Sequence, residues 1–135
     1  MLFRSQFEVA IDGPAVVLGA PAEIHSIVAN LLTNAVKYTP EGGSLRVAWT
    51  IDAAGGHLAV SDTGIGIAAE HLPRLTERFY RVDPGRSRQL GGTGLGLAIV
   101  KHALQRHGGS LEISSIEGKG STFTCHFPAR RLLAA

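Results

Sequence analysis

The sequence predicts an α+β fold: a two-layer α/β sandwich in which three helices cover one face of a mixed, mostly antiparallel sheet. Apolar residues recur at helical spacing over residues 21–38 and in two later segments, each of which follows a glycine-rich stretch. Short segments of alternating apolar and polar residues lie between these helices. Since no stretch is long enough to be a linker, we expect a single domain over residues 1–135, with its core at about 6–128.

The first third of the chain predicts two strands and a long helix. Residues 6–11 alternate apolar and polar side chains, and a second short strand is expected at 15–18 after the turn residues 12–14, which together indicate a β-hairpin. Pro21 suits the first turn of a helix that we expect to run to about Tyr38. The apolar stripe of this helix consists of Ile24, Ile27, Val28, Leu31, Leu32 and Ala35.

The middle of the chain predicts a meander and a second helix. Segments 44–51 and 57–61 alternate on either side of a short glycine turn, so we expect them to pair. A helix should begin at about Ala68, because apolar residues recur at i, i+3 and i+7 from Leu72. The segment 82–89 that follows has little apolar content and indicates a loop over a site.

The last third of the chain predicts a third helix and a final hairpin. The helix should begin at residue 93 or 94 and end at His107, where two glycines follow. Strands are expected at 111–115 and 121–127, joined by a glycine-containing turn. The basic residues and alanines at the C terminus have the pattern of a ragged end.

Composition narrows the classes of protein to which the chain can belong. With 135 residues, 44% of them hydrophobic and 18% charged, it can bury one core and is not a disordered segment. The net charge of +2 is too small to indicate a nucleic-acid partner. The single cysteine, Cys125, excludes an internal disulfide and is expected to be a buried or half-buried strand thiol. Without a membrane-helix or signal-peptide pattern, we expect a soluble chain with no direct membrane contact.

One edge of the first helix carries side chains that a purely structural helix does not need. Asn30, Asn34 and Lys37 fall within an arc of about 60° beside the apolar stripe. Asparagine is a poor helix former, and a position in the middle of a helix makes capping a weak explanation. We therefore interpret Asn34 as a functional residue, with solvation as the alternative.

Two glycine-rich stretches indicate a nucleotide site. Residues 62–67 (DTGIGI) follow a strand, and the carboxylate of Asp62 either accepts a hydrogen bond from an exocyclic amine such as that of adenine or caps a turn. Residues 91–96 (GGTGLG) run into a helix, whose free N–H groups favour an anion. The alternative for this second stretch is a loop before a core helix. The arginines between the two stretches either contact phosphate or are solvated.

Spacing excludes four familiar kinds of site. No lysine follows Gly96, as a P-loop requires, and the glycines at 92, 94 and 96 do not match the dinucleotide fingerprint. The six histidines show no metal-binding spacing, and there is no Gly-x-Ser-x-Gly elbow. What remains is a nucleotide site built from an asparagine helix, an aspartate–glycine turn and a glycine-rich helix start.

In order and spacing, these motifs resemble the four boxes of sensor histidine kinase catalytic domains. Residues 30–38 (NLLTNAVKY) resemble the asparagine box, and residues 62–66 (DTGIG) the first glycine box. Residues 77–81 (ERFYR) are similar to the phenylalanine box, and residues 92–97 (GTGLGL) to the second glycine box. The resemblance spans about 6–128 and implies the GHKL ATPase fold, with ATP and Mg²⁺ as ligands.

The resemblance also implies roles for individual residues. Asn34 would ligate Mg²⁺, Asn30 would lie beside it and Lys37 would reach phosphate, so these three are the expected catalytic residues. Asp62 would accept a hydrogen bond from the adenine amine. The other residues expected around the nucleotide are Tyr38, Gly64, Gly66, Ile67, Phe79, Tyr80, Arg81, Arg88, Gly92, Thr93, Gly94, Leu95, Gly96, Leu97 and Thr122.

The residue at position 30 bears on the chemistry. ATP-hydrolysing relatives such as gyrase and the heat-shock chaperones carry a glutamate general base where this chain has Asn30, and an amide cannot take a proton from water. We therefore expect ATP to be held for transfer to a protein histidine and to be hydrolysed slowly. The alternatives are a GHKL-type ATPase and a nucleotide-gated regulator that binds a partner protein.

None of the six histidines is followed by an acidic residue, which is the family pattern for a phosphoacceptor, and no helical hairpin precedes Gln6. The resemblance thus implies an acceptor histidine on a separate dimerisation domain and, through it, a response regulator as partner. Because the chain begins almost inside a strand pattern, we expect a piece of a longer protein. We expect that protein to be anchored in the inner membrane, with this domain on the cytoplasmic side.

Overall fold

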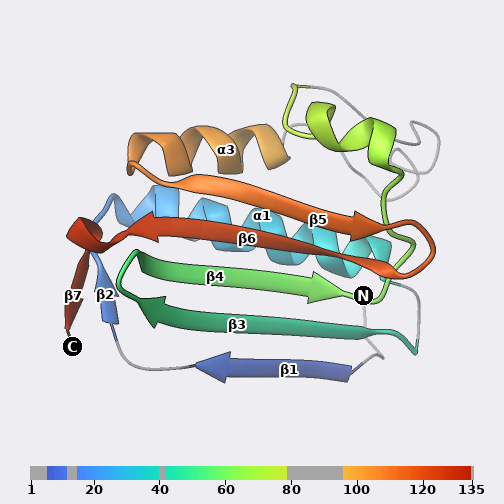
Figure 1. Ribbon diagram of the computed structural model, residues 1–135, viewed down its shortest axis with the longest axis horizontal. Helices are drawn as coiled ribbons and strands as arrows, with labels where there is room; N and C mark the ends of the chain where they lie inside the picture. Colours follow the sequence, from blue (N-terminus) through green and yellow to red (C-terminus); the bar gives the residue numbers. More distant parts are fainter. Residues whose placement is uncertain (1–5, 12–14, 40–41, 79–95, 135) are drawn as a thin grey trace.

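The computed structural model describes residues 6–11, 15–39, 42–78 and 96–134. Its elements, in chain order, are β1 (Gln6–Ile11), β2 (Ala15–Val17), α1 (Pro21–Tyr38), β3 (Ser44–Asp52), β4 (Gly55–Asp62), the 3₁₀ helix η1 (Ala69–Arg74), α3 (Gly96–Arg106), β5 (Ser110–Ile116), β6 (Gly120–Pro128), the 3₁₀ helix η2 (Ala129–Arg131) and β7 (Leu132–Ala134). Figure 1 shows α1 and α3 stacked on one face of the main sheet. The predicted two-layer α+β architecture is confirmed.

The main sheet has five strands in the order β1-β3-β4-β6-β5. The β1–β3 pair is parallel, whereas the three other pairs are antiparallel. The sheet is therefore mixed and mostly antiparallel, as predicted, and the β3–β4 meander and the β5–β6 hairpin both form.

The predicted N-terminal hairpin and the predicted ragged C terminus are both wrong. β1 pairs with β3, and β2 pairs with β7 in a separate two-stranded sheet, where Val17 lies opposite Leu132. Alternation of apolar and polar residues identifies a strand, but it carries no information about which strand becomes its partner. Residues 132–134 are consequently a strand that covers the edge of β2.

Over the described residues up to 78, the second predicted helix is a short 3₁₀ helix, η1. Pro73 lies inside it, and proline has no N–H group and clashes with the preceding turn of an α-helix. Leu75 follows η1 and is buried, so part of the apolar pattern is used for packing. The third predicted position of that pattern, Phe79, lies outside the described residues.

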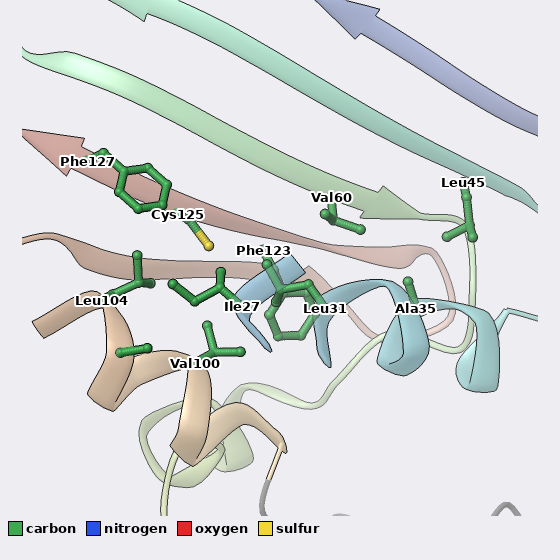
Figure 2. Close-up of a cluster of buried hydrophobic side chains, with 11 residues drawn as sticks. Ile27, Leu31, Ala35, Leu45, Val60, Val100, Leu104, Phe123, Cys125 and Phe127 are labelled. Atoms are coloured by element: carbon green, nitrogen blue, oxygen red, sulfur yellow. The ribbon is translucent and has the colours of Figure 1, made fainter. Parts of the chain in front are cut away.

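The core lies between the two helices and the sheet (Figure 2). Ile27, Leu31 and Ala35 from α1 are at most 1% exposed, which confirms the predicted stripe of that helix. From α3, Val100 and Leu104 point into the same cluster. The sheet contributes Leu45, Val60, Phe123, Cys125 and Phe127. Burial raises the pKa of the Cys125 thiol to about 12, so this cysteine is the buried, packed thiol that was predicted.

The two helices run antiparallel and are offset along their axes. At one end, the Oε1 atom of Glu23 near the start of α1 lies 2.9 Å from Nε of Arg106 at the end of α3. In the middle of α1, Asn30 lies against Gly96, the first residue of α3. The last roughly two turns of α1 therefore extend beyond the start of α3. We call the Glu23 end of the helix pair the closed end, and the opposite end the open end.

Candidate functional site

The open end collects sequence-predicted polar residues from two parts of the chain, α1 and the end of β4. Figure 1 shows the end of α1, the end of β4 and the β5–β6 turn at the same end of the molecule. Asn34 and Lys37 lie in the part of α1 that extends beyond α3, and each is partly exposed. Asp62 is the last residue of β4. A ligand that spans the open end can thus meet the helix edge and the strand end together.

Asn30 makes the contact between the two helices at the start of α3. Its Nδ2 atom donates a hydrogen bond to the carbonyl oxygen of Ser26, one turn earlier, at 2.8 Å. A Cβ atom at Gly96 would lie 3.0 Å from Oδ1 of Asn30, so a side chain at position 96 would press on this amide. Gly96 therefore lets α3 begin close to α1, and the amide oxygen of Asn30 faces that junction.

Asp62 is a partly buried carboxylate at the end of its strand. Its Oδ1 atom accepts a hydrogen bond from the N–H of Gly64 at 2.9 Å, so the turn cap considered from the sequence is present. Burial raises the pKa of Asp62 above its ordinary value, and the N–H groups of Gly64 and Ser121 act in the opposite direction. A carboxylate that is partly desolvated in this way costs folding free energy, which favours a role in binding.

Gly66 holds the turn that follows Asp62 against the β5–β6 hairpin. Its φ of 69° lies in the left-handed region, and a Cβ atom there would lie 2.1 Å from the carbonyl oxygen of Ile116. Next to this contact, the N–H of Gly118 donates to the carbonyl oxygen of Ile65 at 2.7 Å. The structure thus gives Gly66 a packing role, in addition to the room for a planar ligand that the sequence suggested. Gly64 itself is buried.

Thr122 is not brought together with Asp62. Its Oγ1 atom lies 3.0 Å from Oγ of Ser61, on the face of the sheet opposite the helices. The hydroxyl on the same face as Asp62 belongs to Ser121, which is 7% exposed and lies directly opposite Asp62 in the β4–β6 ladder. Sequence reasoning missed Ser121, and only the register of the two strands could have identified it, because one step along a strand changes the face.

Several predicted nucleotide contacts lie outside the described residues: Phe79, Tyr80, Arg81, Arg88, Gly92, Thr93, Gly94 and Leu95, together with the side chain of Tyr38. Of the remaining predicted residues, Leu97 in the first turn of α3 packs against the core. Ile67 does the same from the turn that follows Asp62. These two apolar side chains anchor the start of α3 and the turn after Asp62 to the core.

Other features of the described part do not compete with this site. No group of three or more histidine, cysteine, aspartate or glutamate side chains there is arranged to hold a metal ion. A groove of about 540 Å³ between α1 and α3 is lined by Glu23, Ile99 and Arg106, among others, and shares no residue with the predicted site. None of the helices in this part is long and apolar enough to cross a bilayer.

The chain matches one protein family over most of its length. Residues 19–131 match the family described as histidine kinase-, DNA gyrase B- and HSP90-like ATPase. The phosphate regulon sensor protein PhoR of Pseudomonas aeruginosa is 61% identical over 123 residues, which cover 90% of this chain and 28% of that protein. The sensor-like histidine kinase SenX3 of Mycolicibacterium smegmatis is 44% identical over 93% of this chain and 33% of that protein. The chain thus spans about a third or less of the length of these relatives.

Solved structures give the same result. The mycobacterial sensor histidine kinase MprB superposes with a TM-score of 0.80 and 33% identity, over 95% of this chain and 84% of that chain. Full-length ShkA, solved in complex with AMPPNP, superposes with a TM-score of 0.81 and 30% identity, over 97% of this chain and 27% of that one. The motifs, the fold and these similarities agree, and the chain belongs to the histidine kinase-, DNA gyrase B- and HSP90-like ATPase family, within its sensor histidine kinases.

Proposed function

We propose that the chain is the ATP-binding catalytic domain of a longer two-component sensor kinase. It binds ATP with Mg²⁺ and transfers the γ-phosphoryl group to a histidine on a separate dimerisation domain, from which a response regulator receives it. The observation that carries the proposal is the partly buried carboxylate of Asp62, the last residue of β4, because the end of β4 lies at the same end of the molecule as the end of α1, the helix that carries Asn34 (Figure 1). The structure of full-length ShkA with AMPPNP supports a nucleotide as the ligand.

The adenine base is the part of the ligand that Asp62 suits. A carboxylate is an acceptor only, so it favours the exocyclic amine of adenine over the carbonyl oxygen that guanine carries at the same place. The hydroxyl of Ser121, opposite Asp62 in the ladder and on the same face of the sheet, would be the second polar group beside the base. We therefore place the base beside the turn of residues 62–67 and the phosphates toward α1.

The asparagine edge of α1 suits a hard cation and phosphate. Mg²⁺ prefers oxygen ligands, keeps several waters and is commonly shared with phosphate oxygens, so the amide oxygen of Asn34 fits as a protein ligand that adds no charge. Lys37, about one turn further on, supplies a positive charge for a phosphate. When bound, Mg²⁺ neutralises phosphate charge, while the side chains of this edge position the nucleotide.

Asn30 favours transfer over hydrolysis. Its Nδ2 atom is engaged with the carbonyl oxygen of Ser26, and its remaining polar atom is an amide oxygen that cannot act as a general base at neutral pH. Water at this position would not be activated, so ATP would persist until an acceptor histidine arrives. The same consideration disfavours a GHKL-type ATPase.

Titration calorimetry with ATP, with and without Mg²⁺, tests the site. Asn34→Ala should lose most of the Mg²⁺ dependence of binding, whereas Thr33→Ala, at an exposed neighbour on the same helix, should behave like the parent. Asp62→Asn should lose preference for ATP over GTP. Unchanged binding in both site variants would remove the assignment of these residues.

A second experiment tests the transfer. The chain is mixed with radiolabelled ATP and a helical dimerisation domain that carries an acceptor histidine, and label is expected on that histidine and not on this chain. A nucleotide-gated regulator would bind ATP equally well and transfer nothing, so label on neither protein would favour that alternative. Localisation on the cytoplasmic side of the inner membrane, through a membrane anchor elsewhere in the parent protein, is part of the same proposal.

A further inference from the structure

The hydroxyl of Ser115 lies where the turn of residues 62–67 meets the β5–β6 hairpin. Its oxygen accepts a hydrogen bond from the N–H of Ile67 at 2.7 Å. The same hydroxyl donates to the carbonyl oxygen of Gly120 at 3.0 Å and lies 2.8 Å from Oγ of Ser121. One side chain therefore connects both ends of the hairpin turn to the end of the base-binding turn.

The hydrogen-bonding capacity of Ser115 is fully used by these contacts. A serine hydroxyl has one proton to donate and two lone pairs. The proton goes to Gly120, so the lone pairs receive the N–H of Ile67 and the hydroxyl proton of Ser121. Nothing is left for a ligand, and any effect of Ser115 on a nucleotide must pass through the groups that it holds.

The groups held by Ser115 are those nearest to the proposed base. Because Ser121 gives its proton to Ser115, the lone pairs of Ser121 remain available on the face of the sheet that carries Asp62. Ile67 closes the turn that begins at Asp62, and Gly66 in between allows the turn to lie directly on the hairpin backbone. Removing the Ser115 hydroxyl would remove the hydrogen bond that holds the N–H of Ile67. It would also let the Ser121 hydroxyl rotate.

We propose that Ser115 is a positioning residue for base recognition: its hydroxyl clamps the turn of residues 62–67 and orients Ser121, and so sets the preference for adenine. This inference rests on the proposed function, because it assumes that the turn binds a base. It adds a residue that lies on a different strand from Asp62 and makes no contact with the ligand itself.

The test compares three variants at neighbouring positions of β5. Ser115→Ala removes the hydroxyl, Ser115→Thr keeps one, and Ser114→Ala is the matched control on the exposed side of the same strand. Affinities for ATP and GTP are measured by calorimetry, and exchange of the Ile67 amide proton is followed by NMR in the protein without nucleotide. Ser115→Ala should bind ATP about three- to tenfold more weakly, with a smaller ATP to GTP ratio and faster exchange at Ile67. Ser115→Thr should restore most of each property, and Ser114→Ala should match the parent.

Different outcomes overturn different statements. If Ser115→Ala exchanges faster at Ile67 but keeps the ATP to GTP ratio of the parent, the hydroxyl is purely structural and the inference fails. Unaltered exchange at Ile67 would show that the clamp is absent, which also overturns it. If the parent and Ser114→Ala bind no ATP, the proposed function itself fails, and that result is distinguishable because both of these proteins keep the hydroxyl of Ser115.

Discussion

The closed and open ends of the helix pair are built from similar residues but used differently. At the closed end, most polar groups contact one another: Arg106 pairs with Oε1 of Glu23, and His107 accepts a hydrogen bond from the N–H of Ala20 through Nε2 at 3.1 Å. The other carboxylate oxygen of Glu23, Oε2, is buried 3.6 Å from Nδ1 of His107 and has no hydrogen-bond partner in the described part of the chain. At the open end, Asn34 and Lys37 in the last two turns of α1 and Asp62 at the end of β4 are each partly exposed. Figure 1 shows that each strand of the main sheet has one terminus at each of these two ends.

Both ring nitrogens of His107 make hydrogen bonds at the closed end. This histidine is 3% exposed, its Nδ1 atom donates to the carbonyl oxygen of Ala103 at 2.7 Å, and its Nε2 atom accepts from the N–H of Ala20, the residue before α1. A Cβ atom at Gly19 would lie 2.4 Å from Nε2, so the chain that enters α1 packs directly on the imidazole. The closed end is therefore the part of the molecule where substitution should cost stability without changing binding, and the open end the part where it should also cost binding.

The largest expected effect is a loss of stability at the closed end. Leu104 is 0% exposed, and Leu104→Ala should lower the free energy of unfolding by about 2–5 kcal/mol. The affinity of the folded fraction for ATP should stay as in the parent. Urea unfolding measures the first quantity and calorimetry the second. Ile99→Ala, at a 44% exposed position on the same helix, is the control and should cost much less; an equal loss would contradict the packing described here.

The next largest effect is a loss of stability at the open end. It can be measured by comparing two glycines that share a left-handed backbone conformation. Gly66 and Gly118 have φ values of 69° and 82°, but a Cβ atom would meet the Ile116 backbone only at Gly66. Gly66→Ala should therefore cost about 3 kcal/mol of stability and weaken ATP binding, whereas Gly118→Ala should cost only the left-handed strain of about 1–2 kcal/mol. Unfolding and calorimetric titration of both variants measure the difference. Equal costs would show that the close approach of the turn to the hairpin is unimportant.

A smaller effect, of opposite sign, is expected at Asp62. The folded-state pKa of Asp62 is raised, so the folded chain binds this proton more tightly than the unfolded chain does. Stability without nucleotide should thus fall as the pH rises from the ordinary pKa of 3.8 through the raised value. Asp62→Asn should raise the midpoint of thermal unfolding at neutral pH and weaken ATP binding about tenfold, since a charge-assisted hydrogen bond is lost. A lower midpoint in Asp62→Asn would contradict a burial cost at this residue.

The sequence predicted best those features that depend on a single segment. The stripe of α1, the glycines after α3 and the aspartate–glycine turn all use local spacing or local turn chemistry, and the structure has each of them. The sequence did not predict which distant strands pair with each other. The predicted N-terminal hairpin is wrong for that reason. The candidate site divides in the same way. Asn34 and Asp62 follow from local patterns, whereas Ser115 and Ser121 depend on the register of β4, β5 and β6.

The smallest expected effect concerns the aspartate at the other end of the β3–β4 hairpin. Asp52 is exposed and accepts a hydrogen bond from Nε2 of His57 at 2.9 Å. This hydrogen bond, together with those from the N–H groups of Ala54 and Gly55, lowers the pKa of Asp52 below its ordinary value of 3.8. Its contribution to stability is therefore complete above pH 3.8 and is lost as the pH falls through the lowered folded-state value.

Asp52 and Asp62 should consequently shift the acid unfolding profile in opposite directions. Asp52→Asn should flatten the fall in the thermal midpoint below about pH 4 and leave ATP binding unchanged, because no ligand is expected at this end. His57→Ala should have part of the effect of Asp52→Asn, because it removes the hydrogen bond from His57 but keeps those from the N–H groups of Ala54 and Gly55. Thermal unfolding between about pH 3 and pH 7 measures the three profiles. Weaker ATP binding in Asp52→Asn would show that the two ends of the sheet are not independent, and would break the distinction between a closed end that stabilises and an open end that binds.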